Sequence, residues 1–248
     1  TASGSARTDE AAVFIAKHVN TINVTDMKWN SRIVEHGPIE LPEFSGLRVL
    51  MLPVYLHDVV GSLPTAMRAW IETVLALVRV APIRTGIGYL TVDERAVPAG
   101  SCHRRPGLHV DGWSNDIGNG LWGGGSWAGG GMLMATSHLG SYAYAQAFVG
   151  EPLEFGDCSA LRDQIRREAV RDITANRAWW LSPMTVHESI PANIDQQRQF
   201  VRLSMPSDGQ WPASCTPNPR VMPPHGICQA RPDDVTYYAP APAPRVLV

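Results

Sequence analysis

Short apolar runs, separated by glycine, proline and polar residues, recur along this chain and predict a mixed, β-rich fold. The run over 46–54 is almost continuously apolar, which is typical of a buried strand, and we expect Pro53 to end it. Further strands are expected at the apolar runs over residues 88–92, 131–136, 142–148, 178–181 and 199–204.

Helical spacing of apolar residues occurs in three places. Thr8 is expected to cap an amphipathic helix over 8–19, because acids fill its first turn. A second helix is expected to begin at Pro64, and its apolar stripe consists of Met67, Trp70, Ile71, Val74, Leu75 and Val78. We expect this stripe to pack on the outside of a sheet. A third helix is expected over 158–170, with Asp157 as its N-cap.

The two ends and one internal segment have the composition of loops. Residues 1–7 are small and polar and are expected to be disordered, and the proline-rich residues 206–248 are expected to form an irregular C-terminal extension. Residues 112–131 are dense in glycine and tryptophan but lack the pattern of a phosphate-binding loop. Because this segment follows a candidate metal ligand, we expect a lid over a substrate, with a disordered insertion as the alternative.

Composition and charge limit the possible functions. A length of 248 residues and a hydrophobic fraction of 44% fit one globular domain over 1–248. The formal net charge of −2 provides no cationic field for nucleic acid, and no apolar run reaches the roughly 20 residues of a membrane span. No Cys-x-x-Cys pair occurs, which argues against a structural zinc site, and we expect a cytoplasmic protein with reduced thiols.

His109 and Asp111 are the first candidate metal ligands. On an extended segment, positions i and i+2 project from the same face, so an imidazole and a carboxylate there can hold one ion together. His187 supplies a third ligand later in the chain. Two histidines and one carboxylate on one face of a metal, with the other face open, are the ligand set of non-haem Fe(II) oxygenases. We therefore expect His109, Asp111 and His187 to be the metal ligands and the catalytic residues.

The strand expected after His187 carries a candidate anion site. Arg202 and Ser204 share one face under strand periodicity, and a guanidinium pairs bidentately with a carboxylate while a hydroxyl adds one more donor. Arg198 lies on the same face and is the alternative arginine, unless it occupies an exposed position at the end of the strand. We prefer Arg202 because Ser204 completes an Arg-x-Ser pattern.

The order His109-x-Asp111, His187 and then Arg202-x-Ser204 resembles the Fe(II)/2-oxoglutarate-dependent oxygenases. The resemblance implies a double-stranded β-helix, the jelly roll also found in cupins, with flanking helices. It implies Fe(II), 2-oxoglutarate and O2, with Arg202 and Ser204 binding the far carboxylate of 2-oxoglutarate. The implied reaction converts 2-oxoglutarate to succinate and CO2 while the substrate is hydroxylated, desaturated or cyclised. The presence of Asp111 departs from the halogenases of this family, which lack that carboxylate.

We expect a small-molecule substrate, such as an amino acid or a natural-product intermediate, with no nucleic acid or membrane as partner; a homodimer is left open. The candidate substrate contacts are Arg104, Arg105, Trp113 and His138. Two other functions remain as alternatives. Zinc accepts the same three ligands in a hydrolase, and a non-catalytic jelly roll could bind a sugar or peptide through the aromatic-rich segment.

Overall fold

The structure is a computed structural model that describes residues 28–111, 130–206, 211–212, 216–221 and 227–228. The part of the chain outside these ranges includes the expected helix over 8–19, the terminal residues 1–7, Trp113 with nearly all of the glycine-rich segment, and most of the extension over 206–248. Within the described residues the fold is β-rich, and its two largest sheets are antiparallel.

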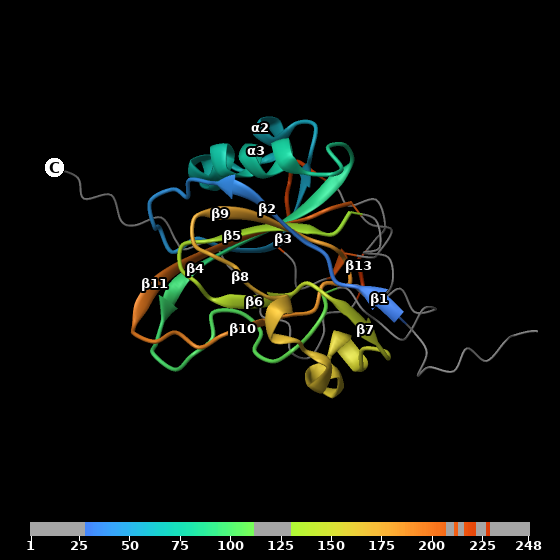
Figure 1. Ribbon diagram of the computed structural model, residues 1–248. Helices are drawn as coiled ribbons and strands as arrows, with labels where there is room; N and C mark the ends of the chain where they lie inside the picture. Colours follow the sequence, from blue (N-terminus) through green and yellow to red (C-terminus); the bar gives the residue numbers. More distant parts are fainter. Residues whose placement is uncertain (1–27, 112–129, 207–210, 213–215, 222–226, 229–248) are drawn as a thin grey trace, which may run out of the picture.

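The largest sheet has six strands in the order β2-β9-β5-β11-β4-β3 (Figure 1). Its strands are β2 (Ile33–Pro38), β3 (Arg48–Tyr55), β4 (Ile87–Val97), β5 (Met132–Thr136), β9 (Arg177–Leu181) and β11 (Gln196–Ser204). β11 pairs with β4 along its whole length, from Gln196 opposite Val97 to Ser204 opposite Tyr89. This pairing fixes which side chains of β11 face inward, because a slip of one residue would turn all of them to the other face.

A second sheet has three strands in the order β10-β6-β8 and lies on the opposite side of the large sheet from the helices α2 (Val59–Ser62) and α3 (Ile71–Val80) (Figure 1). Its strands are β6 (Ser141–Tyr144), β8 (Val170–Asp172) and β10 (His187–Ser189). The remaining strands form two pairs, β1 (Lys28–Asn30) with β7 (Ala147–Val149) and β12 (Trp211–Pro212) with β13 (Ile227–Cys228).

Helices cover the outer face of the six-stranded sheet (Figure 1). They are α2 (Val59–Ser62), the 3-10 segment η2 (Thr65–Trp70) and α3 (Ile71–Val80). The members of the expected apolar stripe that are buried against the sheet are Met67, Trp70, Val74 and Val78. This confirms the amphipathic interpretation, and each such side chain stabilises the fold by roughly 1.5–3 kcal/mol through burial.

A separate apolar cluster fills the space between the two sheets. Its buried members are Met132, Met134, Ala143, Ile173, Trp179, Leu181 and Phe200. Successive side chains of β5 point to opposite faces of the sheet. Met132 and Met134 belong to the cluster between the sheets, whereas Leu133 and Ala135 belong to the cluster under the helices. The inward faces of β5 and β11 are therefore the ones that can contribute to a site between the sheets.

The prediction of an α-helix over 158–170 is wrong. The segments in this region are η4 (Glu154–Gly156), η5 (Ser159–Gln164) and η6 (Arg167–Ala169), all of them 3-10 turns. The side-chain amide of Gln146 donates to the Gln164 carbonyl and accepts from the Arg166 N–H. In a continuous helix these two backbone groups would bond to other backbone groups of the same helix. Asp157 accepts a hydrogen bond from the backbone N–H of Ser159 at 2.7 Å, but no α-helix begins there.

Pro53 does not end β3, which continues to Tyr55. β3 is an edge strand of the large sheet, and a proline is tolerated there because its missing N–H is not needed by the ladder. The described part of the C-terminal extension lies along this edge. Thr216 N donates to the Leu50 carbonyl at 2.8 Å, and Asn218 Nδ2 donates to the Pro53 carbonyl at 2.7 Å. The extension therefore covers part of an otherwise open sheet edge.

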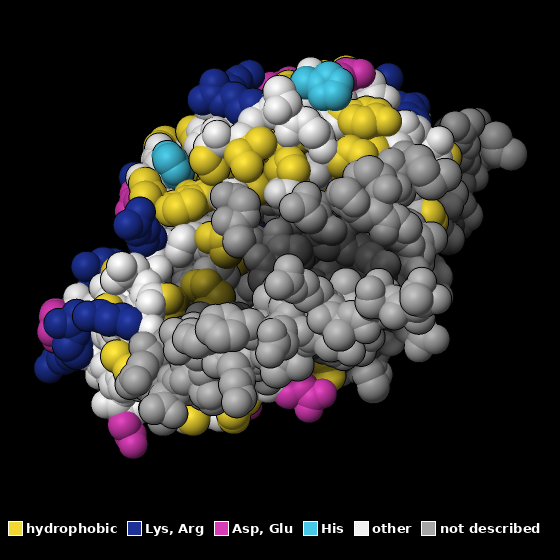
Figure 2. All heavy atoms as spheres, turned by 90° about the vertical axis from the view of Figure 1, so that its right-hand side faces the viewer, with side chains coloured by type: hydrophobic (Ala, Val, Ile, Leu, Met, Phe, Trp, Pro, Cys, Tyr) yellow, Lys and Arg dark blue, Asp and Glu magenta, His cyan; other side chains and the backbone are white. Residues whose placement is uncertain are grey.

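No helix among the described residues is both long enough and apolar enough to span a membrane. On the face in Figure 2, Lys and Arg side chains lie in separate groups near the margin, and hydrophobic side chains are visible elsewhere on the surface. The described part of this face thus has no continuous cationic surface.

Candidate metal centre

His109 and His187 are joined through their backbones. His109 N donates to the His187 carbonyl and His187 N donates to the His109 carbonyl, each at 2.9 Å. This isolated antiparallel bridge ties the loop before Asp111 to the first residue of β10, and the two imidazole centroids lie 4.3 Å apart. His109 and Asp111 do not belong to a longer strand, but this local pairing puts them beside His187 all the same.

A backbone carbonyl orients each imidazole ring. His109 Nδ1 lies 2.7 Å from the Gly107 carbonyl, and His187 Nδ1 lies 2.8 Å from the Thr185 carbonyl. Because a carbonyl can only accept, each Nδ1 carries a proton, and the tautomer that binds a metal through Nε2 is the one that these contacts favour. Burial, together with the neighbouring His187, lowers the pKa of His109 to about 3. His109 is therefore neutral, which is the form of imidazole that binds metals.

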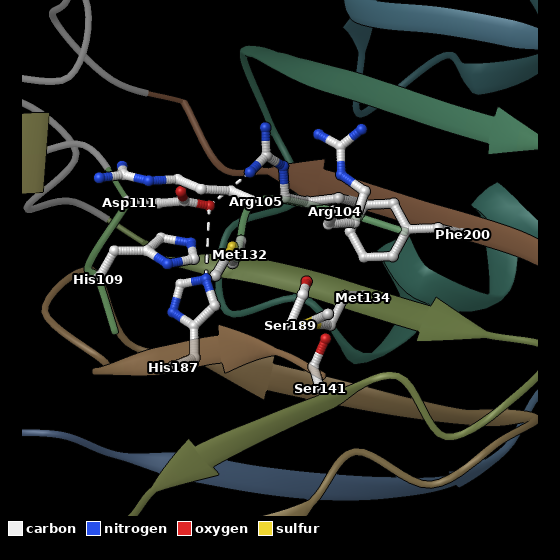
Figure 3. Close-up of a pocket in the computed structure, with 11 residues that line it drawn as sticks. Arg104, Arg105, His109, Asp111, Met132, Met134, Ser141, His187, Ser189 and Phe200 are labelled. Carbon is white, nitrogen blue, oxygen red and sulfur yellow. Dashed lines mark hydrogen bonds and ion pairs between the residues drawn. The ribbon is translucent and has the colours of Figure 1, made fainter. Parts of the chain in front are cut away.

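Asp111 supplies the carboxylate of the group. Its Oδ2 lies 3.9 Å from His187 Nε2 and accepts a hydrogen bond from Arg202 Nη1. Burial alone would raise the pKa of Asp111, but the charge of Arg202 and the nearby histidines hold it well below its ordinary value. Figure 3 shows the three side chains converging at one end of a pocket.

These three residues fit a divalent transition metal ion. One ligand atom from each lies within 4.8 Å of the other two. Bonds of about 2.1 Å to imidazole and carboxylate, arranged octahedrally, need donor atoms about 3 Å apart, so small side-chain rotations are sufficient. Two imidazoles that each contact a backbone carbonyl through Nδ1, and one ionised carboxylate, also match the donor types and supporting hydrogen bonds of such sites.

Arg202, on the inner face of β11, contacts this group directly. Its guanidinium donates through Nη1 to Asp111, and Nη2 lies 3.6 Å from Met51 Sδ. Met51 lies in a bulge of β3, next to the Arg202 guanidinium. Its φ is +49°, which is unfavourable for residues other than glycine. A strained backbone position in β3 therefore holds the thioether against the guanidinium that pairs with Asp111.

Arg198 lies on the same face of β11, four residues before Arg202 and so about 13 Å away along the strand. Its side chain is only 2% exposed, which excludes the exposed position considered from the sequence. Nη2 donates to the His138 carbonyl at 3.3 Å, whereas Nε and Nη1 have no hydrogen-bond partner among the described residues. Burial lowers the pKa of Arg198. A buried guanidinium with unpartnered donors is a candidate anion-binding group.

A pocket of about 400 Å³ extends from the three candidate ligands into the space between the sheets. It is lined by Arg104, Arg105, His109, Asp111, Met132, Met134, Ser141, His187, Ser189, Phe200 and Arg202. In Figure 3, Ser141 lies at the end of the pocket away from His109 and Asp111. A side chain on the preceding residue, Gly140, would collide with the Arg198 guanidinium, so Arg198 adjoins this far end.

The structure brings only some of the expected binding residues to the pocket. Arg104 and Arg105 line it, whereas Trp113 lies outside the described residues. Ser204 is buried at the end of β11 and does not line the pocket. His138 does not line it either, because its Nδ1 pairs with the hydroxyl of the preceding serine at 2.9 Å and its carbonyl faces Arg198.

The sequence interpretation missed several lining residues, namely Met132, Met134, Ser141 and Ser189. Ser189 could have been found, since it lies two residues after His187 on a strand and must share its face. The two methionines had no such signal. β5 is apolar on both faces, and only the packing of the sheets determines which face meets the pocket.

No protein-family model matches this sequence, and no curated protein matches it. The function therefore has to be inferred from the geometry of the site.

Proposed function

We propose that this protein is an Fe(II)- and 2-oxoglutarate-dependent oxygenase that acts on a small molecule. The observation that carries the proposal is the group formed by His109, Asp111 and His187 at the end of a pocket. Two neutral imidazoles and one carboxylate are the ligand set of non-haem iron oxygenases, and they leave the remaining metal positions open. Two antiparallel sheets around the pocket support a double-stranded β-helix of the jelly-roll type.

In this proposal His109 and His187 bind Fe(II) through Nε2, and Asp111 binds it through its carboxylate. Bound iron supplies the redox chemistry that O2 and 2-oxoglutarate require. Arg202 keeps Asp111 ionised and limits its rotation. The carbonyls that accept from the two Nδ1 atoms hold the rings in place, so neither ring has to reorient when the ion binds.

The far carboxylate of 2-oxoglutarate needs a cation at some distance from the metal, because the other end of the molecule chelates. Arg202 already contacts a metal ligand, whereas Arg198 adjoins the far end of the pocket with two donors unpartnered. Pairing with a carboxylate would relieve the cost of burying those donors. We therefore assign this carboxylate to Arg198, with the hydroxyls of Ser141 and Ser189 as further donors, in preference to Arg202 and Ser204.

The rest of the pocket is suited to contact a carbon skeleton. Met132, Met134 and Phe200 are nearly buried and form an apolar wall next to the candidate ligands. Such a wall excludes water and holds a substrate C–H group near the metal. This arrangement supports hydroxylation, desaturation or cyclisation of a small molecule.

The proposal is tested by measuring succinate. Protein supplied with Fe(II), 2-oxoglutarate, ascorbate and air is expected to form succinate slowly even without a substrate, and Zn(II) in place of Fe(II) should give none. His187→Ala should reduce the rate to background. His36→Ala, which removes an exposed histidine of β2, is the matched control and should not.

The two other functions considered from the sequence make different predictions in this test. Zinc-dependent hydrolysis of an ester or amide without succinate formation would replace the proposal with a hydrolase that uses the same ligands. A protein that binds neither metal would be a non-catalytic binder.

A further inference from the structure

The pocket has more positive than negative side chains. Arg104, Arg105 and Arg202 line it, and among the described lining residues Asp111 is the acid. Asp111 is already paired with Arg202. The two remaining arginines therefore determine the charge that a ligand meets at the pocket wall.

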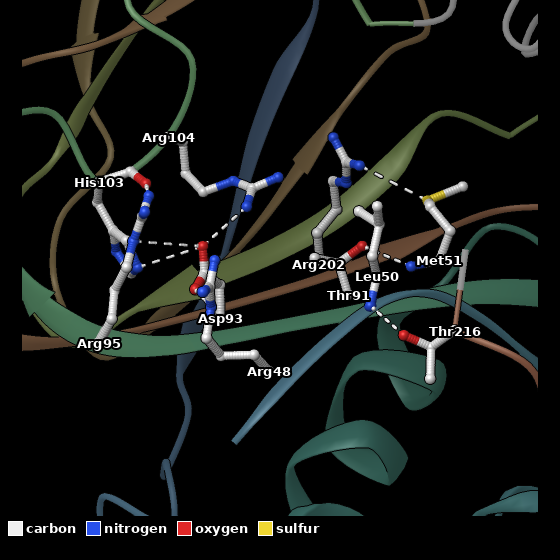
Figure 4. Close-up of polar contacts among 10 residues, drawn as sticks. All are labelled: Arg48, Leu50, Met51, Thr91, Asp93, Arg95, His103, Arg104, Arg202 and Thr216. Atoms are coloured by element: carbon white, nitrogen blue, oxygen red, sulfur yellow. Dashed lines mark hydrogen bonds and ion pairs between the residues drawn. The ribbon is translucent and has the colours of Figure 1, made fainter. Parts of the chain in front are cut away.

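Arg104 belongs to a cluster of ion pairs around the buried Asp93 (Figure 4). Asp93 is completely buried, and Arg104 Nη1 lies 2.9 Å from its Oδ2. Arg48 Nε and Arg95 Nε lie 3.0 Å and 3.6 Å from the same carboxylate, and His103 Nε2 lies at 3.6 Å. Burial alone would raise the pKa of Asp93, but these neighbours hold it well below its ordinary value. The carboxylate is thus ionised and anchors the guanidinium of Arg104.

Within the part of the chain that the structure describes, Asp93 is the carboxylate that these three guanidinium groups share, and one negative charge does not balance three positive charges. Of the three, only Arg104 lines the pocket. We therefore expect a positive electrostatic potential at the pocket wall beside Arg104.

The surroundings of Arg104 also indicate the kind of molecule that carries the negative charge. Its guanidinium carbon lies 5.0 Å from the centroid of the Phe200 ring, which keeps the flat cation against the inner wall. Beside it, Met132 and Met134 present apolar surface. A ligand that satisfies both features has a compact anionic group attached to an apolar body.

We propose that the substrate of this pocket is a small organic acid whose carboxylate pairs with Arg104 while its apolar body packs on Phe200 and the two methionines. This proposal deepens the proposed oxygenase function and rests on it, because the bound acid is a substrate only if the protein is an oxygenase. The anion subsite itself is distinct from Arg198, to which we assign 2-oxoglutarate, and it does not depend on which metal is bound.

The test compares acids with their neutral amides. The probes are 3-phenylpropionate against 3-phenylpropionamide and hexanoate against hexanamide, measured by calorimetry on protein loaded with Zn(II) and saturating 2-oxoglutarate, and again on metal-free protein. Each acid is expected to bind about 10- to 100-fold more tightly than its amide, as for one charged hydrogen-bonded pair. Equal affinities of acid and amide in the wild-type protein would overturn the proposal, and this comparison needs no variant.

Variants then locate the subsite. Arg104→Gln should remove the preference for acids and leave amide binding unchanged. Arg48→Gln is the matched control, because it removes another guanidinium from Asp93 without altering the pocket wall, and it should keep the preference. An undiminished preference in Arg104→Gln, an equal loss in Arg48→Gln, or displacement of 2-oxoglutarate by the acids would each overturn the assignment.

Failure of the subsite and failure of the oxygenase proposal give different results. Zn(II) and 2-oxoglutarate binding without a preference for acids would remove only the subsite. A preference for acids in protein that binds neither Zn(II) nor 2-oxoglutarate would support the subsite and remove the proposed function.

Discussion

Asp93 and Asp111 are two aspartates near one pocket, and each faces arginine side chains. Asp93, on β4, is completely buried and is surrounded by three arginines and His103. Asp111 keeps 31% of its side-chain surface exposed and pairs with one arginine, and His187 Nε2 lies close to it. The pKa of each is held well below the ordinary value, so the difference between them is not one of ionisation.

The difference lies in what each carboxylate can still bind. The neighbours of Asp93 are cationic side chains and hydrogen-bond donors of the protein itself. Its negative charge therefore stabilises the fold and the position of Arg104. Asp111 lies next to the imidazoles of His109 and His187, and one ligand atom from each of the three residues lies within 4.8 Å of the other two, so together they can hold a cation. An arginine near an aspartate therefore does not identify a candidate metal site, whereas two imidazoles that converge on the aspartate do.

The largest effect on stability is expected from Asp93→Asn. It should lower the free energy of unfolding by about 3–5 kcal/mol, because the completely buried carboxylate loses its charged hydrogen bonds with Arg48 and Arg104, each worth about 1.5–3 kcal/mol. Asp111→Asn should cost clearly less, since its side chain is partly exposed. Urea unfolding of both metal-free variants at neutral pH provides the measurement. Equal losses would contradict the distinction between the two aspartates.

This difference should also depend on pH. Because the folded pKa of Asp93 is lowered, its stabilisation is fully present above the unfolded value of about 3.9 and is lost as the pH falls below it toward the folded value. The stability gap between wild type and Asp93→Asn should therefore shrink between about pH 5 and about pH 3. A gap that does not change with pH would indicate a packing defect in the variant.

The next largest effect concerns metal binding. His187→Ala should weaken binding of Fe(II) by about 100-fold or more, since even loss of a group that supports a metal ligand costs about 10- to 100-fold. Stability without metal should change far less than in Asp93→Asn. Anaerobic calorimetry with Fe(II) measures the affinity, and His36→Ala serves as the control. Wild-type affinity in His187→Ala would remove His187 from the ligand set.

The two arginines of β11 should differ in their effect on 2-oxoglutarate. Arg198→Lys keeps the charge but loses the planar fork, and a buried charged hydrogen bond is worth about 1.5–3 kcal/mol, so 2-oxoglutarate affinity should fall about 10- to 100-fold. Arg202→Lys should mainly alter metal affinity, because Arg202 contacts Asp111. Titrations of 2-oxoglutarate at saturating Fe(II) compare them. A larger loss in Arg202→Lys would restore the assignment favoured by the Arg-x-Ser pattern.

The smallest effect is expected at Glu188, a third carboxylate that directly follows His187. On β10 it faces away from the pocket and pairs with Arg162 at 2.7 Å and with the Tyr144 hydroxyl. Glu188→Gln should change the free energy of unfolding by about 1 kcal/mol, the usual value for a partly exposed pair, and leave Fe(II) affinity within about twofold. A large loss of metal affinity would mean that this pair orients His187.

Much of the strand content and the grouping of the three candidate ligands could be predicted from the sequence, because both depend on local patterns. The apolar runs at β3, β4, β5, β9 and β11 were long enough to identify. The ligands followed from residue type and from the i, i+2 rule, which the bridge between His109 and His187 satisfies without a longer strand.

What could not be predicted depends on contacts between distant segments. An α-helix was predicted over 158–170, but Gln146 bonds to the backbone of residues 164 and 166. The helical pattern of the sequence does not reveal this contact. The contact of Arg202 with Asp111 and the burial of Arg198 follow from how β11 sits between β4 and β5. The cluster around Asp93 had only a weak signal, a charged triplet at positions 93–95 within an apolar strand.

The central claim is that His109, Asp111 and His187 hold an iron ion to which 2-oxoglutarate chelates. Its most direct test is the visible absorption spectrum of the protein with Fe(II) under anaerobic conditions, recorded before and after addition of 2-oxoglutarate. A weak charge-transfer band should appear only when both are present, and it should be absent with Zn(II) or in His187→Ala. Bound Fe(II) without this band at saturating 2-oxoglutarate, or an unchanged band in His187→Ala, would contradict the account.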